Sequence, residues 1–113
     1  RARGFEARAI PGVPSFCAVA AALERDLTPE MSSPLHIVPG GYDDARRAIG
    51  WPGTKVVMKA RRSLADTKCI LREEGAFDGA ELVEDCGLPG ERVYRSLDDV
   101  PDRGSYFSTM VVR

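Results

Sequence analysis

A chain of 113 residues with 43% hydrophobic and 29% charged side chains has the composition of one soluble globular domain. Its 16 Lys and Arg nearly balance its 17 Asp and Glu, so charge gives no bias toward nucleic acid. No apolar run approaches the length of a bilayer, which leaves a membrane partner without support. The three cysteines are widely spaced and odd in number, which favours a reducing cytoplasm over a disulfide framework or a zinc site.

Turn-forming residues divide the chain into short strands and helices. The expected strands cover residues 6–10, 35–38, 54–59, 80–84, 92–96 and 105–113, and the expected helices cover 15–27, 43–49 and 63–74. Ser15 is a candidate N-cap for the first helix, and Ser63 with Asp66 resembles a capping box for the third. Because the last two strands are consecutive, the sequence predicts an α/β domain with a mixed sheet of about five or six strands flanked by helices.

The stretch Ile10–Phe16, with sequence IPGVPSF, is a rigid connection between the first strand and the first helix. Its two prolines fix φ, and Gly12 between them accepts the resulting turn. Free N–H groups at the helix start could hold polar groups of a ligand, although a structural loop with nothing bound is the alternative. Two further loops follow Met58 and Glu84. Because open α/β sheets bind ligands beyond the ends of their strands, these three loops together predict a cleft.

No group of side chains predicts a catalytic nucleophile or a metal site. His36, the single histidine, lies in a strand-like run with no Ser, Cys or Asp at catalytic spacing, and a structural role is favoured. Cys17 and Cys69 are interpreted as small core residues. The adjacent carboxylates at 43–44 and 98–99 point in different directions and are typical of helix starts and turns.

Several blocks of the chain, taken in order, resemble the C-terminal part of the tetrapyrrole methylases, and within them the precorrin-2 C(20)-methyltransferases of cobalamin (vitamin B12) biosynthesis. These blocks are IPGVPSF at 10–16, PLHIVP at 34–39, PGTKVVMK at 52–59, LVEDCGLPGERVYRSL at 82–97 and GSYFST at 104–109. The first block and the Val-Glu-Asp block are shared widely by tetrapyrrole methylases. The Tyr-Arg-Ser-Leu and Tyr-Phe-Ser blocks resemble the C(20) enzymes in particular.

The resemblance implies a two-lobed, cytoplasmic, homodimeric enzyme that moves a methyl group from S-adenosyl-L-methionine to C-20 of precorrin-2 or cobalt-precorrin-2. The glycine-rich strand-loop and the Gly-Asp-Pro loop of the family's N-terminal lobe do not occur here, and the chain begins with Arg. We therefore expect residues 1–113 to be the C-terminal domain alone, inactive by itself. Expected partners are a small tetrapyrrole substrate and a second copy, with no nucleic acid, membrane or metal.

Carried over residue by residue, the resemblance assigns six positions to cofactor binding: Pro14, Ser15, Met58, Cys86, Ser108 and Thr109. Asp85 stands where many relatives have Asn, which could alter a hydrogen bond to the cofactor. Methyl transfer from a sulfonium to an electron-rich carbon needs orientation and exclusion of water, so no catalytic side chain is expected. Arg61 or Arg62 could steer the carboxylates of the substrate.

Two other interpretations stay open from the sequence. A non-catalytic dimerisation or interaction module could be built from the same lobe, because the chain lacks the other half of the cleft. A tetrapyrrole methylase with another substrate is also conceivable, but the Tyr-Arg-Ser-Leu block argues against it.

Overall fold

A mixed five-stranded sheet organises the part of the chain that the computed structural model describes, residues 15–28, 33–41, 44–62, 64–102 and 104–113. Its strands are β1 (Leu35–Pro39), β2 (Thr54–Met58), β3 (Ala80–Glu84), β4 (Arg92–Tyr94) and β5 (Ser108–Val112). The α-helices are α1 (Ser15–Leu23), α2 (Ala45–Ile49) and α3 (Leu64–Glu73), and two short 3-10 turns cover Phe77–Gly79 and Leu97–Asp99. The predicted α/β class with a mixed sheet and flanking helices is confirmed.

The strands lie in the order β1-β2-β5-β3-β4. β1 pairs with β2 in parallel, and β5 is antiparallel to both β2 and β3, so β1, β2 and β3 all run the same way. β4 forms an antiparallel hairpin with β3 at the other edge. The carboxyl ends of β2 and β3 therefore lie at the same end of the sheet as the start of β5, with Met58 opposite Thr109 and Glu84 opposite Ser108.

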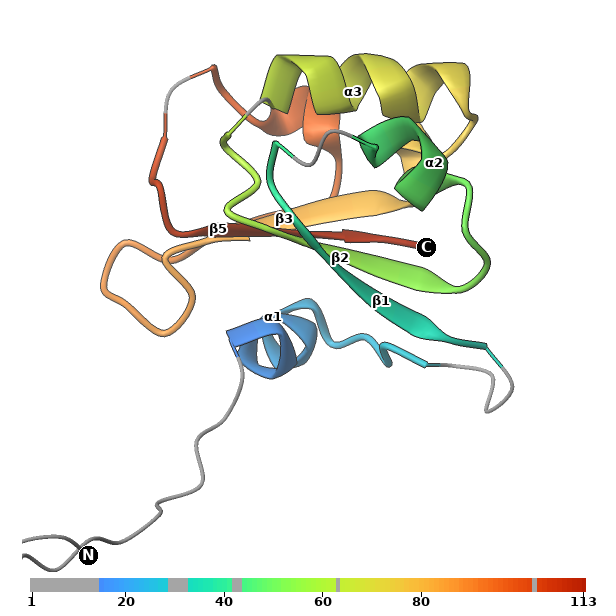
Figure 1. Cartoon of the computed structure of the whole chain (residues 1–113). Coiled ribbons are helices and arrows are strands. Elements are labelled where there is room, and N and C mark those ends of the chain that lie inside the picture. The colour runs from blue at the N-terminus through green and yellow to red at the C-terminus, as the bar shows by residue number, and fades with distance from the viewer. Residues whose placement is uncertain (1–14, 29–32, 42–43, 63, 103) are drawn as a thin grey trace, which may run out of the picture.

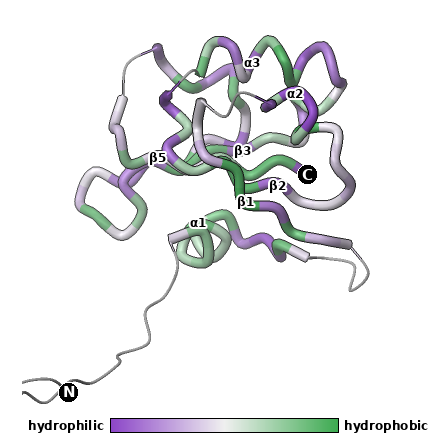
Figure 2. The backbone as a smooth tube through the Cα atoms, viewed as in Figure 1, coloured by the Kyte–Doolittle hydropathy of each residue, from purple (hydrophilic) through white to green (hydrophobic). Residues whose placement is uncertain are grey.

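Helices cover both faces of the sheet, with α2 and α3 on one face and α1 on the other (Figure 1). Because side chains alternate along a strand, neighbouring residues of β3 join different cores. Leu82 packs in the larger cluster together with Leu71 of α3, while Val83 packs against Val19 of α1. Figure 2 shows the matching hydropathy, with apolar residues along the central strands and around α1. No helix of the described residues is long and apolar enough to cross a membrane.

The first helix ends at Leu23, four residues before the predicted end. Glu24 adopts a left-handed conformation with φ of 55°, and the Arg25 N–H donates to the Ala20 carbonyl at 3.0 Å, which is a helix C-cap of the left-handed type. The Arg95 guanidinium bonds the Leu23 carbonyl at 3.0 Å and Glu81 at 3.1 Å. This contact joins the end of α1 to the sheet, and it comes from a residue far away in sequence.

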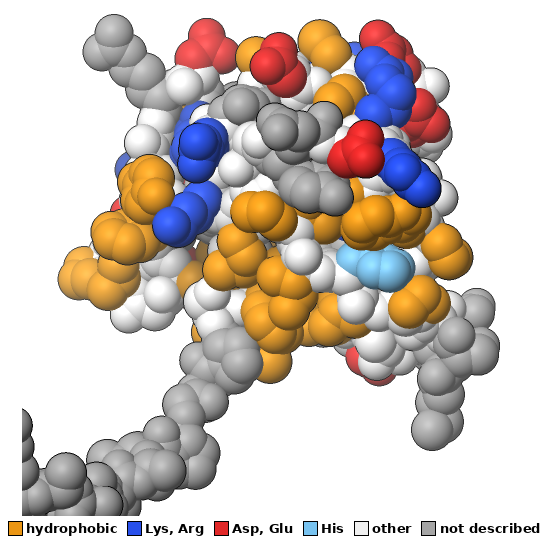
Figure 3. Space-filling model, in the orientation of Figure 1, with side chains coloured by type: hydrophobic (Ala, Val, Ile, Leu, Met, Phe, Trp, Pro, Cys, Tyr) orange, Lys and Arg blue, Asp and Glu red, His pale blue; other side chains and the backbone are white. Residues whose placement is uncertain are grey.

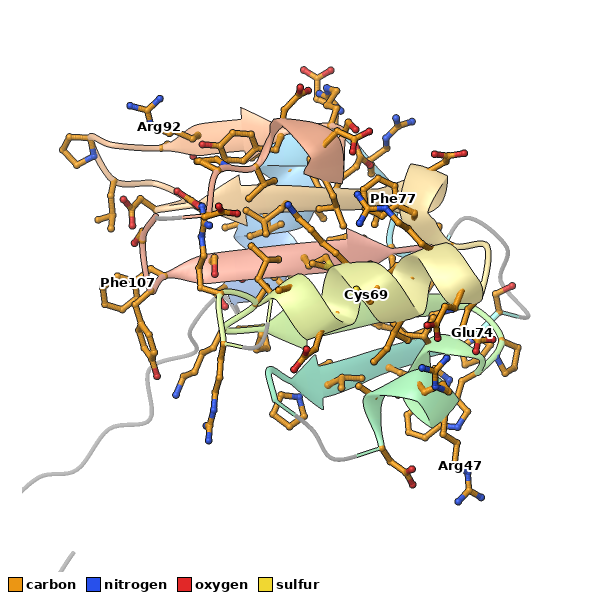
Figure 4. All side chains as sticks on the ribbon, turned by 90° about the horizontal axis from the view of Figure 1, so that it is seen from above. Arg47, Cys69, Glu74, Phe77, Arg92 and Phe107 are labelled. Atoms are coloured by element: carbon orange, nitrogen blue, oxygen red, sulfur yellow. The ribbon has the colours of Figure 1, made fainter. Side chains whose placement is uncertain are left out.

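The interpretation of Cys17 and Cys69 as core residues is wrong, because both thiols are exposed. In α3 the buried residues Leu64, Thr67 and Leu71 follow the helical spacing of three and four, which leaves Cys69 on the outer face (Figure 4). Cysteine is small enough to be placed on either face, so residue type alone does not decide its burial.

Other predictions have mixed outcomes. His36 is half-buried and its ring lies 4.9 Å from that of Trp51, in agreement with a structural role. The carboxylates at 98–99 lie in a 3-10 turn, where the Ser96 hydroxyl accepts from the Asp98 N–H at 3.3 Å. The expected strand 6–10, the loop 10–14 and the cap residue Ser63 lie outside the described residues.

Candidate functional site

A cavity of about 310 Å³ opens at the edge of the sheet where β2 and β3 end and β5 begins. Its walls come from α1, the ends of β2 and β3, the loop after β3 and the segment leading into β5. The lining residues are Ser15, Val19, Met58, Lys59, Val83, Asp85, Cys86, Leu88, Tyr106, Phe107, Ser108 and Thr109. The cavity thus lies beyond the carboxyl ends of parallel strands, the place where open α/β sheets bind ligands.

Five of the six positions assigned to the cofactor line this one cavity: Ser15, Met58, Cys86, Ser108 and Thr109. The sixth, Pro14, lies outside the described residues. These five residues are far apart in the sequence, from the first described helix to the last strand, and the sheet brings them together. The loops after Met58 and Glu84, two of the three from which a cleft was predicted, line this cavity, while the loop after Ile10 lies outside the described residues. Cofactor binding by these residues stays a prediction.

Two residues at the cavity have an unusual backbone conformation. Lys59 directly follows β2 with φ of 54°, and Asp85 directly follows β3 with φ of 49°. A left-handed conformation costs a non-glycine residue roughly 1–2 kcal/mol and is concentrated at functional sites in proteins. This conformation turns the chain sharply after β2 and again after β3, so the ends of both strands stay open to the cavity.

The loop after β1 packs closely against the end of β2. The Gly40 N–H donates to the Met58 carbonyl at 2.7 Å, and a Cβ at Gly40 would collide with the Lys59 carbonyl. Only glycine allows this approach. The hydrogen bond from Gly40 fixes the Met58 backbone. The half-buried Met58 side chain lines the cavity.

Asp85 is committed to contacts within the protein. Its N–H donates to the Phe107 carbonyl at 2.8 Å, and its carboxylate accepts a hydrogen bond from the Ser105 hydroxyl. The Ser105 hydroxyl oxygen in turn accepts from the Phe107 N–H at 3.1 Å. Asp85 thus ties the loop after β3 to the segment before β5, across the mouth of the cavity.

A buried ion pair lies next to these loops. Arg61 and Glu84, whose side chains are 9% and 5% exposed, are joined from the Arg61 Nε at 2.8 Å and from its Nη2. Arg61 also donates to the Pro101 carbonyl, and its backbone N–H donates to the Ser108 hydroxyl at 3.0 Å. Gly104 packs on the pair so closely that a Cβ has no room. We call this pair the Arg61–Glu84 clamp.

The clamp overturns the idea that Arg61 steers substrate carboxylates. Its guanidinium is buried, and its Nε, Nη1 and Nη2 each donate a hydrogen bond within the protein, to Glu84 or to the Pro101 carbonyl. Arg62 is exposed and lies on the loop after β2. Sequence reasoning could not separate the two adjacent arginines, because their burial depends on where Glu84 lies after folding.

Cys86 is the one thiol in the cavity wall of the described chain. Burial raises the pKa of the Cys86 thiol, and the nearby Glu91 carboxylate raises it further. Glu91 itself accepts the Gly87 N–H at 2.9 Å, which closes the loop after β3. A raised pKa keeps the thiol protonated, so Cys86 is suited to packing and not to nucleophilic attack.

Sequence reasoning did not assign four residues of the wall to the site, Lys59, Leu88, Tyr106 and Phe107, although they belong to the matching blocks. Asp85 was noted only as a departure from Asn. The available signal was position, since each lies within four residues of a strand end at the carboxyl edge. Among the described residues, no group of three or more His, Cys, Asp or Glu side chains could hold a metal ion. The site is therefore an apolar cavity edged by hydroxyls.

An apolar cavity at the ends of parallel strands is a typical place for a small ligand to bind. Residues 1–100 match the family described as Tetrapyrrole (Corrin/Porphyrin) Methylases, and the chain belongs to this family. Two relatives give the comparison more detail.

Over 107 residues the chain is 33% identical to the cobalt-precorrin-2 C(20)-methyltransferase of Salmonella typhimurium, a match that covers 91% of this chain and 45% of that protein. It also resembles the crystal structure of the uroporphyrin III C-methyl transferase from Thermus thermophilus, with a TM-score of 0.63 and 25% identity. That match covers 91% of this chain and 48% of the other. The chain spans about half the length of the relatives it matches.

Proposed function

We propose that this chain is the C-terminal half of an enzyme that transfers a methyl group from S-adenosyl-L-methionine to C-20 of precorrin-2 or cobalt-precorrin-2 in cobalamin biosynthesis. Membership of the tetrapyrrole methylases supports the reaction class, and the 33% sequence identity to the Salmonella enzyme supports the choice of substrate. The observation that carries the proposal is the single cavity that gathers Ser15, Met58, Cys86, Ser108 and Thr109.

The cavity fits part of such a cofactor. At about 310 Å³ it lies at the small end of ligand pockets, about 300–1,000 Å³, as expected of one side of a shared cleft. Apolar walls at Val19, Met58 and Val83 suit a thioether and a purine, while the hydroxyls of Ser15 and Thr109 can bond polar groups. The cofactor, when bound, supplies an electrophilic methyl group on a sulfonium.

The contribution of the chain is binding and orientation. Met58 and Val83 exclude water from the reacting centre, which protects a reactive sulfonium and strengthens polar contacts. The left-handed turns at Lys59 and Asp85 redirect the chain directly after β2 and β3, which leaves the cavity at their ends accessible to a reactant. The methyl group replaces a hydrogen on the ring carbon, so that hydrogen leaves as a proton and the cofactor leaves as S-adenosylhomocysteine. We propose that the complete protein is a cytoplasmic homodimer.

The test is calorimetric titration of S-adenosylhomocysteine into this chain and into the chain joined to its natural upstream sequence. We expect the joined protein to bind and the chain alone to bind at least tenfold more weakly, since half of the contacts are missing. Thr109→Val, which removes only a hydroxyl from the wall, should weaken binding, whereas Cys69→Ala on the outer face of α3 should not. Absence of binding by both proteins would refute the methyltransferase proposal and favour an interaction module.

A further inference from the structure

The segment that leads into β5 has little apolar packing of its own. Tyr106 and Phe107 are 57% and 68% exposed although both line the cavity. Figure 3 shows apolar side chains protruding at the left of the molecule, where this segment lies in Figure 1. Exposed rings bury little apolar surface, so the hydrophobic effect does not hold this part of the wall in place. Its position depends on polar contacts with the neighbouring loops.

The clamp lies on the face of the sheet opposite the cavity. Glu84 and Ser108 stand opposite each other on β3 and β5. Two residues along each strand, Leu82 and Met110 pack in the larger cluster on the side of α3. Because side chains alternate along a strand, the side chains of Glu84 and Ser108 point to that side, whereas Thr109 points to the cavity side. The clamp therefore contacts the ends of both strands from the side that faces α3.

Hydrogen bonds from the clamp reach three segments of the cavity wall. The Arg61 side chain joins the loop after β2 to Glu84 at the end of β3, and it also donates to the Pro101 carbonyl. Glu84 accepts from the Ser105 N–H at 3.5 Å, and the Ser108 hydroxyl accepts from the Arg61 N–H at 3.0 Å. The loop after β2, the end of β3 and the start of β5 are thus held together at one point.

The same ion pair constrains the two left-handed turns. Lys59 lies two residues before Arg61, and Asp85 directly follows Glu84. A left-handed conformation is costly for a residue other than glycine and persists only where the surrounding structure enforces it. An ion pair that joins the residues beside both turns enforces it here, because a loop that relaxed would separate the guanidinium from the carboxylate.

We propose that Arg61 and Glu84 are positioning residues for cofactor binding, which hold the cavity wall in its binding shape without touching the ligand. Neither residue belongs to the described wall, and both side chains are buried. Their effect on binding therefore acts through the backbone of the wall segments, above all through Ser108. This inference rests on the proposed function, because the ligand that the wall fits is then S-adenosyl-L-methionine.

The experiment measures S-adenosylhomocysteine binding by the joined protein with calorimetry, together with amide hydrogen exchange and urea unfolding. Arg61→Met/Glu84→Leu removes both charges and leaves no buried ion unpaired, so most of the stability is retained. We expect this variant to bind about tenfold more weakly or worse, because the wall is misplaced. Hydrogen exchange should become faster at the amides of Ala60, Asp85 and Phe107, which donate hydrogen bonds within these segments.

Two further variants separate positioning from a general loss of stability. Lys55→Met removes a buried cation at the other end of β2, and it should change neither the affinity nor the exchange of the wall amides. Arg61→Lys keeps the charge but lacks the fork that reaches both Glu84 and Pro101, so its affinity should lie between those of the double variant and the unchanged protein.

Equal affinity of the double variant and the unchanged protein would overturn the proposal, as would an equal loss in Lys55→Met. If the double variant does not fold, Arg61→Lys decides, and binding as tight as that of the unchanged protein contradicts the proposal. Failure of the unchanged joined protein to bind S-adenosylhomocysteine overturns the proposed function instead. Hydrogen exchange then decides for the clamp: faster exchange confined to the wall amides supports it, and exchange that is unchanged or faster throughout the protein overturns it.

Discussion

Replacing Arg61 by Met should destabilise the domain strongly. The change leaves Glu84, 5% exposed, as a buried charge that keeps only the Ser105 N–H at 3.5 Å. Two hydrogen bonds to a charged group, each about 1.5–3 kcal/mol, are lost, and a broken buried pair typically costs about 3–5 kcal/mol. That is a large share of the roughly 5–15 kcal/mol by which a domain is stable.

The assay is urea unfolding followed by circular dichroism. With a slope of about 1–3 kcal/mol per molar urea, a loss of about 3–5 kcal/mol should lower the midpoint of Arg61→Met by about 1 M or more. The double variant Arg61→Met/Glu84→Leu removes both charges and should recover most of the lost stability, because an apolar pair of similar volume can replace a buried ion pair. A midpoint within about 0.5 M of the unchanged protein for the single variant would refute the reasoning, as would a double variant no more stable than the single one.

Three further outcomes can be checked. Burial lowers the pKa of Lys55, whose ammonium donates to the Trp51 and Gly53 carbonyls. Because the unfolded chain then binds more protons in the alkaline range, the free energy of unfolding should rise as the pH is raised there. Urea titrations of Lys55→Met should no longer show this rise. Glu24→Gly should raise the thermal midpoint by relieving a left-handed residue, worth about 1 kcal/mol, whereas Glu24→Val should lower it. Maleimide labelling followed by mass spectrometry should modify Cys17 and Cys69 before Cys86, whose thiol has a raised pKa; equal rates would contradict its burial.

Much of the fold was predictable because the relevant signals are local. The apolar run Val56–Met58 between two lysines indicates a central strand, and it pairs with β1 on one side and β5 on the other. Gly75 marks the end of the third helix, one residue after the predicted end at Glu74 and two after the observed end at Glu73. Chain order then suggested that loops following β2 and β3 would meet, as they do at the cavity.

The errors arose where distant residues decide the outcome. Helix α1 ends at Leu23 although helix-forming residues follow it. The Arg95 side chain, distant in the sequence, donates a hydrogen bond to the Leu23 carbonyl. Arg61 and Arg62 look alike in the sequence, yet only Arg61 meets a buried carboxylate. The exposure of Phe107 is equally hidden, since an aromatic residue beside an apolar strand is more often part of the core.

The position of β5 has a consequence for folding. It is the last strand of the described chain, yet it lies at the centre of the sheet, between β2 and β3. Until it is in place, the sheet consists of two separate ribbons, β1 with β2 and β3 with β4, and a two-stranded ribbon alone is barely stable in water. During synthesis the earlier strands leave the ribosome first, and the edges of β2 and β3 stay unpaired until β5 is available. Chaperone dependence and aggregation should therefore be greatest just before residues 108–112 emerge.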